Sequence, residues 1–457
     1  MIEALLQPDR GQPAHTITLI APSAFDPWLA TQPAAIRAAG AGQRFTGKAG
    51  SHAILPDGDG WQVVAAIDDR ASPWALAKLA EALPEGPYRI AGDTPPALGW
   101  VLGQYRFDRY RKTDGAGPRI LVTRDVAAID PTLALAAATA TVRDLVNTGA
   151  GDMGPADLEA AAQALGGRHR ATLTVTRGDA LTTGYPMIHA VGQAAAKDRQ
   201  PRLIELEWGQ TNHPRIAIVG KGVTFDTGGL DIKPSSGMRL MKKDMGGAAH
   251  ALALAELVMA AKLPVRLHLL IPAVENAIAG NAFRPGDVLR TRKGLTVENT
   301  NTDAEGRLIL GDTLTKAVEG AVEGKPELIL DFATLTGAAR VALGPDLPPL
   351  FANDERLAAE LLAAAAAEHD PLWRMPLWDG YDEMLKSDVA DLVNAPDGGF
   401  AGAITAALFL RRFVPAEIAW AHLDVFAWRP SARPGRPKGG DAFGLRAAFA
   451  MLKTRYR

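Results

Sequence analysis

Short apolar runs alternate with alanine-rich stretches along the first part of the chain. The runs occupy residues 15–20, 60–67, 88–91 and 119–123. Runs of this length, separated by stretches of helix-forming residues, are typical of strands that alternate with helices. The pattern therefore predicts a small α/β domain over residues 1–125.

A second and larger α/β domain is expected after a long helix. Asp130 and Pro131 precede a helical pattern at residues 132–147, and we assign residues 126–148 to a linking helix. Over residues 149–457, helical stretches alternate with strand candidates at 216–220, 266–272, 327–333 and 420–425. Such alternation is typical of a sheet that helices cover on both faces. We expect a mixed, mostly parallel central sheet.

An acidic loop precedes one of the predicted helices. Residues 301–308 read Asn-Thr-Asp-Ala-Glu-Gly-Arg-Leu. Asp303 and Glu305 can project to the same side of an extended segment, Gly306 lets the backbone turn, and Arg307 offers a planar fork for an anion. This composition indicates a metal-binding loop. Taken alone, it is also compatible with a loop whose acidic residues favour the start of the following helix.

Further charged residues follow a strand candidate upstream. Lys221 and Asp226 fall just past the apolar run at residues 216–219, which is where sites form in open α/β sheets. Asp244 precedes two glycines and an alanine-rich helical stretch that ends near residue 262. This carboxylate is therefore expected at a helix N-terminus near the same edge of the sheet.

Together these segments carry too much negative charge to bury without cations. The charged groups are Asp226, Asp244, Asp303 and Glu305, with Lys221 and Lys233 among them. Two divalent ions about 4 Å apart would neutralise the carboxylates, activate a water molecule and polarise a carbonyl. Burial and nearby cations both disfavour an ammonium, so a lysine here can be neutral and ligate a metal. A lone lysine more often forms a surface salt bridge, but the glycines around these two favour close backbone approach.

At these residues the sequence resembles the leucine aminopeptidase (cytosol aminopeptidase) family of dinuclear metallopeptidases. The loop at residues 301–308 is similar to the family signature at every position. Further similar segments are residues 286–289, 293–298, 333–338, 401–410 and 420–424. The resemblance covers roughly residues 135–450 and implies that residues 149–457 form a metallopeptidase domain. No motif is recognised before about residue 125.

The resemblance implies a role for each candidate residue. The tighter of two metal ions, manganese or zinc, would be held by Lys221, Asp226, Asp244 and Glu305. The more exchangeable ion would be held by Asp226, Glu305, Asp303 and the Asp303 backbone carbonyl. In the family, the equivalent of Arg307 binds a bicarbonate ion that serves as general base, and the equivalent of Lys233 stabilises the oxyanion. A guanidinium suits a planar carbonate, and an ammonium aimed at an oxyanion acts most strongly where water is scarce.

The resemblance also implies the substrate and the assembly. The free amine of a peptide would coordinate the tighter metal, which explains the removal of single N-terminal residues. The first side chain would lie against Met241, Thr334, Leu335 and Gly337. A methionine-lined wall is adaptable and apolar, which favours leucine or methionine within a broad range, although a single methionine is equally compatible with a core position. The family implies a homohexamer whose active sites face an inner cavity.

Composition narrows the class of protein further. The 457 residues exceed what one hydrophobic core usually organises. A net charge of −2 argues against a general surface for nucleic acid or anionic membranes, and the absence of cysteine excludes disulfides and thiolate chemistry. The nine histidines lack the spacing of a histidine zinc site. There is no signal-peptide pattern and no apolar run long enough to span a membrane, so we expect a cytoplasmic protein.

Three other functions stay open at this point. A dinuclear phosphoesterase uses a similar carboxylate cluster, although such sites usually include histidines. Hydrolysis of a leucyl anilide rather than of a phenyl phosphate would distinguish the two. A DNA-binding regulator is known among bacterial relatives, but nothing basic in the first domain supports one here. A catalytically inactive scaffold is disfavoured because every chemical position is filled.

Overall fold

The computed structural model describes residues 2–112, 117–319 and 324–457. The chain forms two compact units. The first contains the chain up to Ala140 together with Ser431–Lys438, and the second contains Thr141–Pro430 with Gly439–Arg457. The predicted long helix is present as α5 (Ile129–Asn147) and begins slightly before the predicted residue 132. The predicted domain limits at residues 125 and 148 stay predictions.

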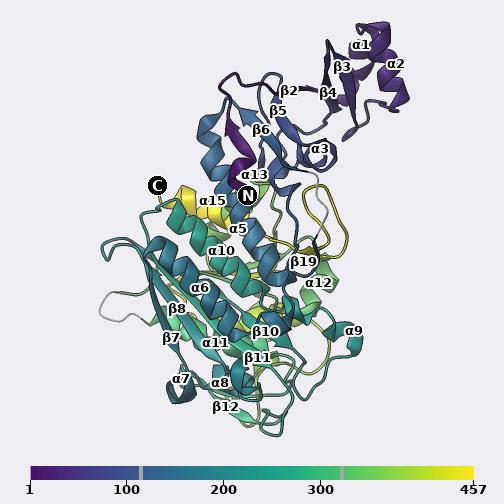
Figure 1. Ribbon diagram of the computed structural model, residues 1–457. Coiled ribbons are helices and arrows are strands. Elements are labelled where there is room, and N and C mark those ends of the chain that lie inside the picture. Colours follow the sequence, from purple (N-terminus) through teal and green to yellow (C-terminus); the bar gives the residue numbers. More distant parts are fainter. Residues whose placement is uncertain (1, 113–116, 320–323) are drawn as a thin grey trace. The chain divides into compact units, whose positions relative to one another are not determined.

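The first unit is built on a six-stranded sheet with the strand order β1-β6-β5-β2-β4-β3 (Figure 1). Its strands are β1 (Leu6–Pro8), β2 (His15–Ile20), β3 (His52–Asp57), β4 (Gly60–Ala66), β5 (Gly86–Ile90) and β6 (Arg119–Thr123). Its helices are α1 (Phe25–Ala30), α2 (Ala34–Gly42), α3 (Ala77–Ala82) and α4 (Leu98–Leu102). Neighbouring strands are parallel except for the β3–β4 hairpin. The predicted small α/β domain is confirmed, with Ile17, Tyr88 and Trp100 buried in its core.

The second unit is organised around a nine-stranded sheet with the order β16-β15-β18-β14-β9-β11-β8-β7, in which β10 also pairs with β11. Its strands are β7 (Thr172–Thr176), β8 (Arg202–Trp208), β9 (Arg215–Gly220), β10 (Gly222–Asp226), β11 (Arg266–Asn276), β14 (Leu328–Ala333), β15 (Pro349–Ala352), β16 (Trp373–Arg374) and β18 (Ala419–Asp424). Strands β18, β14, β9, β11 and β10 are parallel, while β15, β8 and β7 pair antiparallel with their inner neighbours. The predicted mixed, mostly parallel sheet is confirmed. Two small sheets consist of β12 (Val288–Arg290), β13 (Thr296–Glu298) and β17 (Leu392–Val393), and of β19 (Trp428–Arg429) and β20 (Gly439–Gly440).

Helices cover both faces of the nine-stranded sheet. On one face, α10 (Gly246–Ala260) contacts α6 (Pro155–His169) and α15 (Leu445–Arg455). On the other face, α11 (Glu305–Val318) contacts α8 (Pro186–Gly192) and α14 (Gly402–Arg411). Side chains along β14 alternate between the two faces, because Phe332 stacks on His250 of α10 whereas Ile329 joins the core beneath α11.

Further helices of this unit are α7 (Gly178–Gly184), α9 (Ser235–Met238), α12 (Gly337–Leu343) and α13 (Glu355–Ala367). In the part of the chain that the structure describes, no helix combines the length and the apolar character needed to cross a membrane.

The strands next to the predicted site differ from the sequence prediction. Residues 215–226 form two strands, β9 and β10, so Asp226 ends a strand of its own instead of lying in the loop after β9. Strand β11 continues past the predicted end at residue 272, and β10 pairs with this extension. Gly222 permits the close approach, because a β-carbon there would lie 2.7 Å from the carbonyl oxygen of Pro272.

Candidate metal centre

The charged residues predicted from the sequence lie where neighbouring elements begin or end. Strands β9 and β14 are parallel neighbours, so Lys221 and Thr334, which follow them, emerge at the same edge of the sheet. Asp226 ends β10 at that edge, Asp244 precedes α10, and Glu305 is the first residue of α11. The carboxyl edge of the parallel strands therefore gathers these side chains, as in other open α/β sheets.

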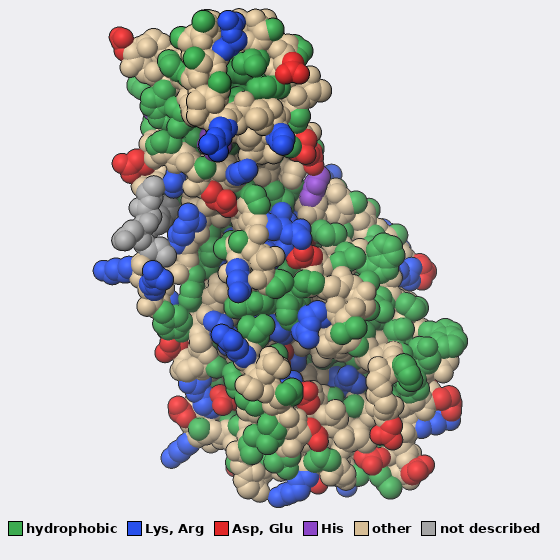
Figure 2. All heavy atoms as spheres, turned by 90° about the vertical axis from the view of Figure 1, so that its right-hand side faces the viewer, with side chains coloured by type: hydrophobic (Ala, Val, Ile, Leu, Met, Phe, Trp, Pro, Cys, Tyr) green, Lys and Arg blue, Asp and Glu red, His purple; other side chains and the backbone are tan. Residues whose placement is uncertain are grey.

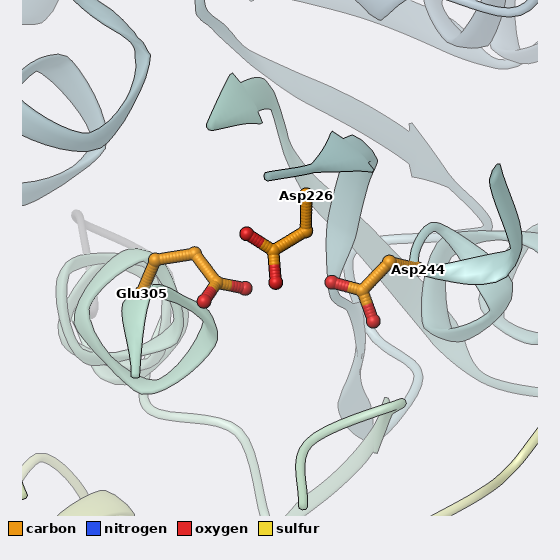
Figure 3. A group of neighbouring side chains, drawn as sticks. All are labelled: Asp226, Asp244 and Glu305. Carbon is orange, nitrogen blue, oxygen red and sulfur yellow. The ribbon is translucent and has the colours of Figure 1, made fainter. Parts of the chain in front are cut away.

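Three buried carboxylates meet at this edge. Asp226, Asp244 and Glu305 each offer an oxygen within 4.8 Å of the others, and Figure 3 shows the carboxyl groups pointing toward one another. These residues are 2%, 3% and 1% exposed, respectively. Carboxylates this close repel one another unless cations compensate their charge. The cluster therefore provides the oxygen ligands that hard divalent cations prefer.

Lys221 lies against two of these carboxylates. Its Nζ is 2.8 Å from Asp244 Oδ2 and 2.9 Å from Glu305 Oε1. Burial disfavours the ammonium, but the charges of Asp244, Glu305 and Asp226 outweigh burial and raise the pKa of Lys221. Cations that neutralised the carboxylates would remove this effect and favour the neutral, metal-ligating form considered from the sequence.

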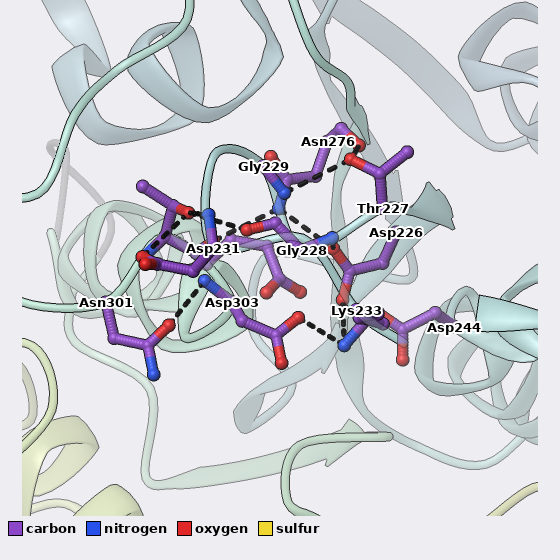
Figure 4. Close-up of polar contacts among 12 residues, drawn as sticks. Asp226, Thr227, Gly228, Gly229, Asp231, Lys233, Asp244, Asn276, Asn301 and Asp303 are labelled. Atoms are coloured by element: carbon purple, nitrogen blue, oxygen red, sulfur yellow. Dashed lines mark hydrogen bonds and ion pairs between the residues drawn. The ribbon is translucent and has the colours of Figure 1, made fainter. Parts of the chain in front are cut away.

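Lys233 connects a cluster carboxylate to the acidic loop. Its Nζ lies 2.8 Å from Asp226 Oδ2 and also pairs with Asp303 Oδ1, as Figure 4 shows. The backbone N–H of Asp303 donates to Asn301 Oδ1 at 2.8 Å, which fixes the loop. Asp303 is thus tied to the cluster through Lys233, whereas the group of three mutually close carboxylates does not include it.

The raised pKa values and unsatisfied oxygens of the acidic residues indicate that this cluster can bind cations. Burial, followed by the charge of Asp226, raises the pKa of Glu305 to about 8 and the pKa of Asp303 to about 6. Within the described chain, one buried oxygen on each of Asp244, Asp303 and Glu305 is contacted only by an ion-paired lysine and accepts no hydrogen bond of good geometry. A divalent cation would restore the charged form of these carboxylates and use those oxygens as ligands. The residues therefore fit a metal centre.

A buried amide orients Asp226. Oδ1 of Asp226 accepts hydrogen bonds from the backbone N–H of Gly228 and from Asn276 Nδ2, each at 2.8 Å (Figure 4). Asn276 also donates to the carbonyl oxygen of Thr302 at 3.1 Å, which links Asp226 to the acidic loop. The apolar pattern of the sequence does not reveal Asn276, because it predicts that strand β11 ends at residue 272. A polar amide a few positions past an apolar run is the only signal that the sequence contains.

Gly306 has a different structural role from the one predicted. The prediction that it turns the backbone is wrong, because Gly306 lies in the first turn of α11 without a positive φ. A β-carbon at this position would lie 2.8 Å from Lys221 Nζ. Glycine is therefore needed here so that Lys221 can reach Glu305.

Arg307 is buried beside the cluster. It is 7% exposed, and its Nη1 donates to the carbonyl oxygen of Asn394 at 2.6 Å. Its Nε has no hydrogen-bond partner among the described residues. Burial lowers the pKa of Arg307 to about 10. The Asn394 carbonyl thus holds Nη1 of the guanidinium in place, while the Nε–H of Arg307 donates to no described residue.

A cavity of about 520 Å³ opens beside the carboxylates. It is lined by the predicted site residues Lys221, Asp226, Lys233, Met241, Asp244, Asp303, Thr334, Leu335 and Gly337. Glu305 and Arg307 do not belong to its lining. A larger hollow of about 1270 Å³, which Lys293 and Arg411 line, contains none of the predicted site residues.

Asp424 also lines this cavity, although the sequence does not single it out. Its Oδ1 accepts a hydrogen bond from the backbone N–H of Leu335 at 2.8 Å, and its Oδ2 accepts one from Thr336 Oγ1 at 2.7 Å. Asp424 therefore holds the loop that follows β14. Its place at the end of the family-like segment 420–424 is the signal that points to it.

Comparison with known proteins identifies the chain. Residues 140–449 match the catalytic domain of the cytosol aminopeptidase family. The chain belongs to the cytosol aminopeptidase family. Residues 16–122 match the M17 aminopeptidase N-terminal domain, so the first unit, in which the sequence shows no motif, has a counterpart among cytosol aminopeptidases as well. The resemblance drawn from the sequence is confirmed.

Similarity to cytosol aminopeptidases extends over nearly the whole chain. A probable cytosol aminopeptidase of Caulobacter vibrioides is 36% identical in an alignment of 478 positions, gaps included, that covers 97% of this chain and 95% of the relative. The crystal structure of a cytosol aminopeptidase from Coxiella burnetii matches with a TM-score of 0.94 at 44% identity and covers 99% of this chain and 100% of that one. The bottromycin maturation enzyme BotP, solved in complex with Mn, matches with a TM-score of 0.86 at 33% identity and covers 97% and 100%.

Membership of the cytosol aminopeptidase family makes this chain a metal-dependent aminopeptidase, a hydrolase that acts on peptides. This result favours the peptidase over the phosphoesterase and the inactive scaffold. On the face shown in Figure 2, Lys and Arg side chains are interspersed with Asp and Glu. That nucleic acid is not a partner stays a prediction.

Proposed function

We propose that this enzyme removes single residues from the free N-terminus of peptides with the help of two divalent ions, manganese or zinc. The observation that carries the proposal is the meeting of three buried carboxylates within 4.8 Å beside a cavity that Lys221 and Lys233 also line. The manganese complex of BotP, a protein of similar fold, supports manganese as one of the ions.

The proposed ligands are those that the family resemblance implies, and the positions of the side chains support them. Figure 3 shows Asp226 between the other two carboxylates, which supports a bridging role for Asp226 together with Glu305. Lys221 and Asp244 would complete the tighter site, and Asp303 with its backbone carbonyl would complete the more exchangeable one. Two divalent ions bound there supply Lewis acidity to the scissile carbonyl and lower the pKa of a water molecule.

Lys233 is proposed to stabilise the oxyanion that forms at the scissile carbonyl. Its side chain lines the cavity and is 14% exposed. It now pairs with Asp226 and Asp303, which are both proposed metal ligands. When those carboxylates bind cations, the donors of Lys233 become available to an oxygen on which negative charge develops.

Arg307 is proposed to hold bicarbonate as the general base. The contact of Nη1 with the carbonyl of Asn394 and the unused Nε support this role, because a guanidinium binds a planar anion through parallel N–H donors. The described lining of the cavity includes no histidine that would accept the proton from water. An anion held by Arg307 would supply that base.

The cavity lining supports leucine or methionine as preferred first residues. Met241 and Leu335 provide apolar surface, and Thr334 and Gly337 complete the proposed pocket. The flexible, polarizable side chain of methionine adapts to ligands of different shape. We therefore propose a preference for leucine or methionine within a broad range of first residues.

We also propose a cytoplasmic homohexamer with active sites facing an inner cavity. The proposal rests on the family, whose relatives are named cytosol aminopeptidases. Light scattering on the purified enzyme measures its mass in solution. A mass of six chains is expected, and a stable monomer would contradict the assembly.

Metal removal tests the proposed chemistry. After exhaustive chelation, checked by elemental analysis, hydrolysis of leucyl anilide should stop, because the buried carboxylates would lose the cations that compensate them. Manganese or zinc should restore activity, and the restored enzyme should contain two ions per chain. Full activity without metal, or saturation with a single ion, would contradict the dinuclear mechanism.

A further inference from the structure

Two basic side chains line the cavity with little compensation from carboxylates. Lys243 is 5% exposed, and its ammonium forms only a long ion pair, with Asp244 Oδ1 at 3.8 Å. No hydrogen bond from its ammonium to a described residue is present. Arg340 of α12 is exposed and forms no ion pair with the described part of the chain.

An aromatic ring holds these two cations on one wall of the cavity. Lys243 Nζ lies 5.0 Å from the ring centroid of Phe426, and Arg340 Cζ lies 4.8 Å from it. The ring attracts both cations but carries no net charge that would neutralise them. Lys243, Arg340 and Phe426, here called the cationic wall, line the same cavity as Asp226 and Asp244.

The other charged groups of the cavity are already engaged. Lys221 and Lys233 contact the metal-binding carboxylates. Asp424 accepts hydrogen bonds from the backbone N–H groups of Leu335 and Thr336 and from the Thr336 hydroxyl. Arg340 therefore has no acidic partner within the described chain, and Lys243 has only its long contact with Asp244, so the cationic wall is able to accept a carboxylate from a ligand.

We propose that the cationic wall binds a carboxylate of the substrate, so that the enzyme prefers peptides with an acidic group close to the scissile bond. The inference rests on the proposed function, because it assigns another part of the same cavity. A guanidinium and an ammonium are the side chains that bind carboxylates best. The carboxylate belongs either to an acidic first side chain or to the C-terminus of a dipeptide.

Two matched pairs of substrates separate these sources. Glutamyl and glutaminyl anilide differ in the charge of the first side chain, and leucyl-alanine and its C-terminal amide differ in the charge of the C-terminus. In at least one pair, the charged member should have a kcat/KM higher by about tenfold, which corresponds to one charge-assisted hydrogen bond. The pair that shows the effect identifies the source.

Three variants assign the effect to the cationic wall. Arg340→Gln and Lys243→Gln should each bring the ratio within the responding pair close to one. Arg340 is exposed, so its replacement leaves the folded core intact even if the buried Lys243→Gln variant does not fold. Arg239→Gln is the matched control, because Arg239 is exposed and does not line the cavity. This variant should keep the wild-type ratio.

Leucyl anilide distinguishes failure of the inference from failure of the proposed function. If it is hydrolysed but neither pair favours its charged member, or if the preference survives Arg340→Gln, the cationic wall does not bind carboxylates and the inference is wrong. If metal-loaded enzyme does not hydrolyse leucyl anilide or any of the four substrates, the aminopeptidase proposal and the inference both fail.

Discussion

Gly306 leaves the space that the side chain of Lys221 occupies: a β-carbon on Gly306 would lie 2.6 Å from Lys221 Cε. Carbon atoms in folded proteins do not approach so closely, so any other residue would displace the lysine. Glycine in a helix is less favourable than alanine by about 1 kcal/mol. The first turn of α11 therefore gives up local helix stability so that Lys221 can lie between Asp244 and Glu305.

Gly306→Ala should consequently weaken metal binding although it favours the helix. We expect the affinity for the tighter ion to fall by about tenfold or more, because Lys221 and Glu305 would both move. Isothermal titration of the metal-free enzyme measures this change. Gly167→Ala in α6 is the control, since nothing lies within 4 Å of the β-carbon that it would add. Equal metal affinity of both variants would show that Lys221 is not a ligand.

Substitutions of Asp244 and Lys233 should separate metal binding from chemistry. Asp244→Ala removes a proposed ligand, so its metal content should fall. Lys233→Ala should keep both ions and lower kcat by about 10²-fold, as the loss of one oxyanion donor does. Arg307→Ala should be milder, because water can partly replace the anion that Arg307 positions. Elemental analysis and kcat provide the readout, and wild-type turnover of Lys233→Ala with normal metal content would refute its role.

The parallel centre of the large sheet is predictable because its strands are mostly apolar. Strands β9, β14 and β18 are buried on both faces and stand out in the sequence for that reason. Strand β8 does not stand out, because it includes Glu205 and Glu207. Glu205 is buried and lies 3.0 Å from His268 Nε2 on β11. His268 compensates the buried charge of Glu205, and only folding brings these two residues together.

The residues of the candidate site likewise fall into those that the sequence predicts and those that it does not. Its carboxylates and lysines are predictable, because they stand in dense motifs at the ends of apolar runs. The contact of Asn276 with Asp226 and the stacking of Lys243 and Arg340 on Phe426 join residues from separate segments of the sheet edge. No local pattern marks such residues, because their role depends on strand register and on loop paths that only the fold determines.

A buried ion pair near the site should make stability depend on pH. His422 Nδ1 lies 2.5 Å from Asp331 Oδ1, and Trp420 Nε1 donates to Asp331 Oδ2 at 2.6 Å. Burial opposes the charged imidazolium, but the charge and hydrogen bond of Asp331 outweigh burial and raise the pKa of His422. A raised pKa in the folded state means that protonated His422 stabilises the fold below its unfolded pKa. This stabilisation is lost as the pH rises through the pKa of His422 in the folded protein.

His422→Gln should therefore lower the free energy of unfolding more at acidic pH than at alkaline pH. We expect the free energy of unfolding to fall by on the order of 3 kcal/mol near pH 6, because the substitution leaves Asp331 buried without its charged partner. The loss should be smaller at an alkaline pH above the folded-state pKa of His422, where the wild-type histidine has lost its proton. Urea titrations of both proteins at the two pH values measure the difference. An equal loss at both values would mean that the charge of His422 does not contribute.

The substrate's first nitrogen provides the most direct test of the mechanism. If the tighter ion at Lys221 and Asp244 binds that nitrogen, hydrolysis of a leucyl peptide requires a free, uncharged amine. Acetylation withdraws the lone pair from coordination and adds bulk beside the carboxylates, so the capped peptide should react slower by on the order of 100-fold or more. An amide or anilide on the carboxyl side should be accepted, because in the proposed mechanism the scissile carbonyl faces the more exchangeable ion and Lys233. Mass spectrometry of a longer peptide should show residues lost one at a time from the N-terminus. Internal cuts, or equal rates on capped and free peptides, would contradict coordination of the amine and exopeptidase action together.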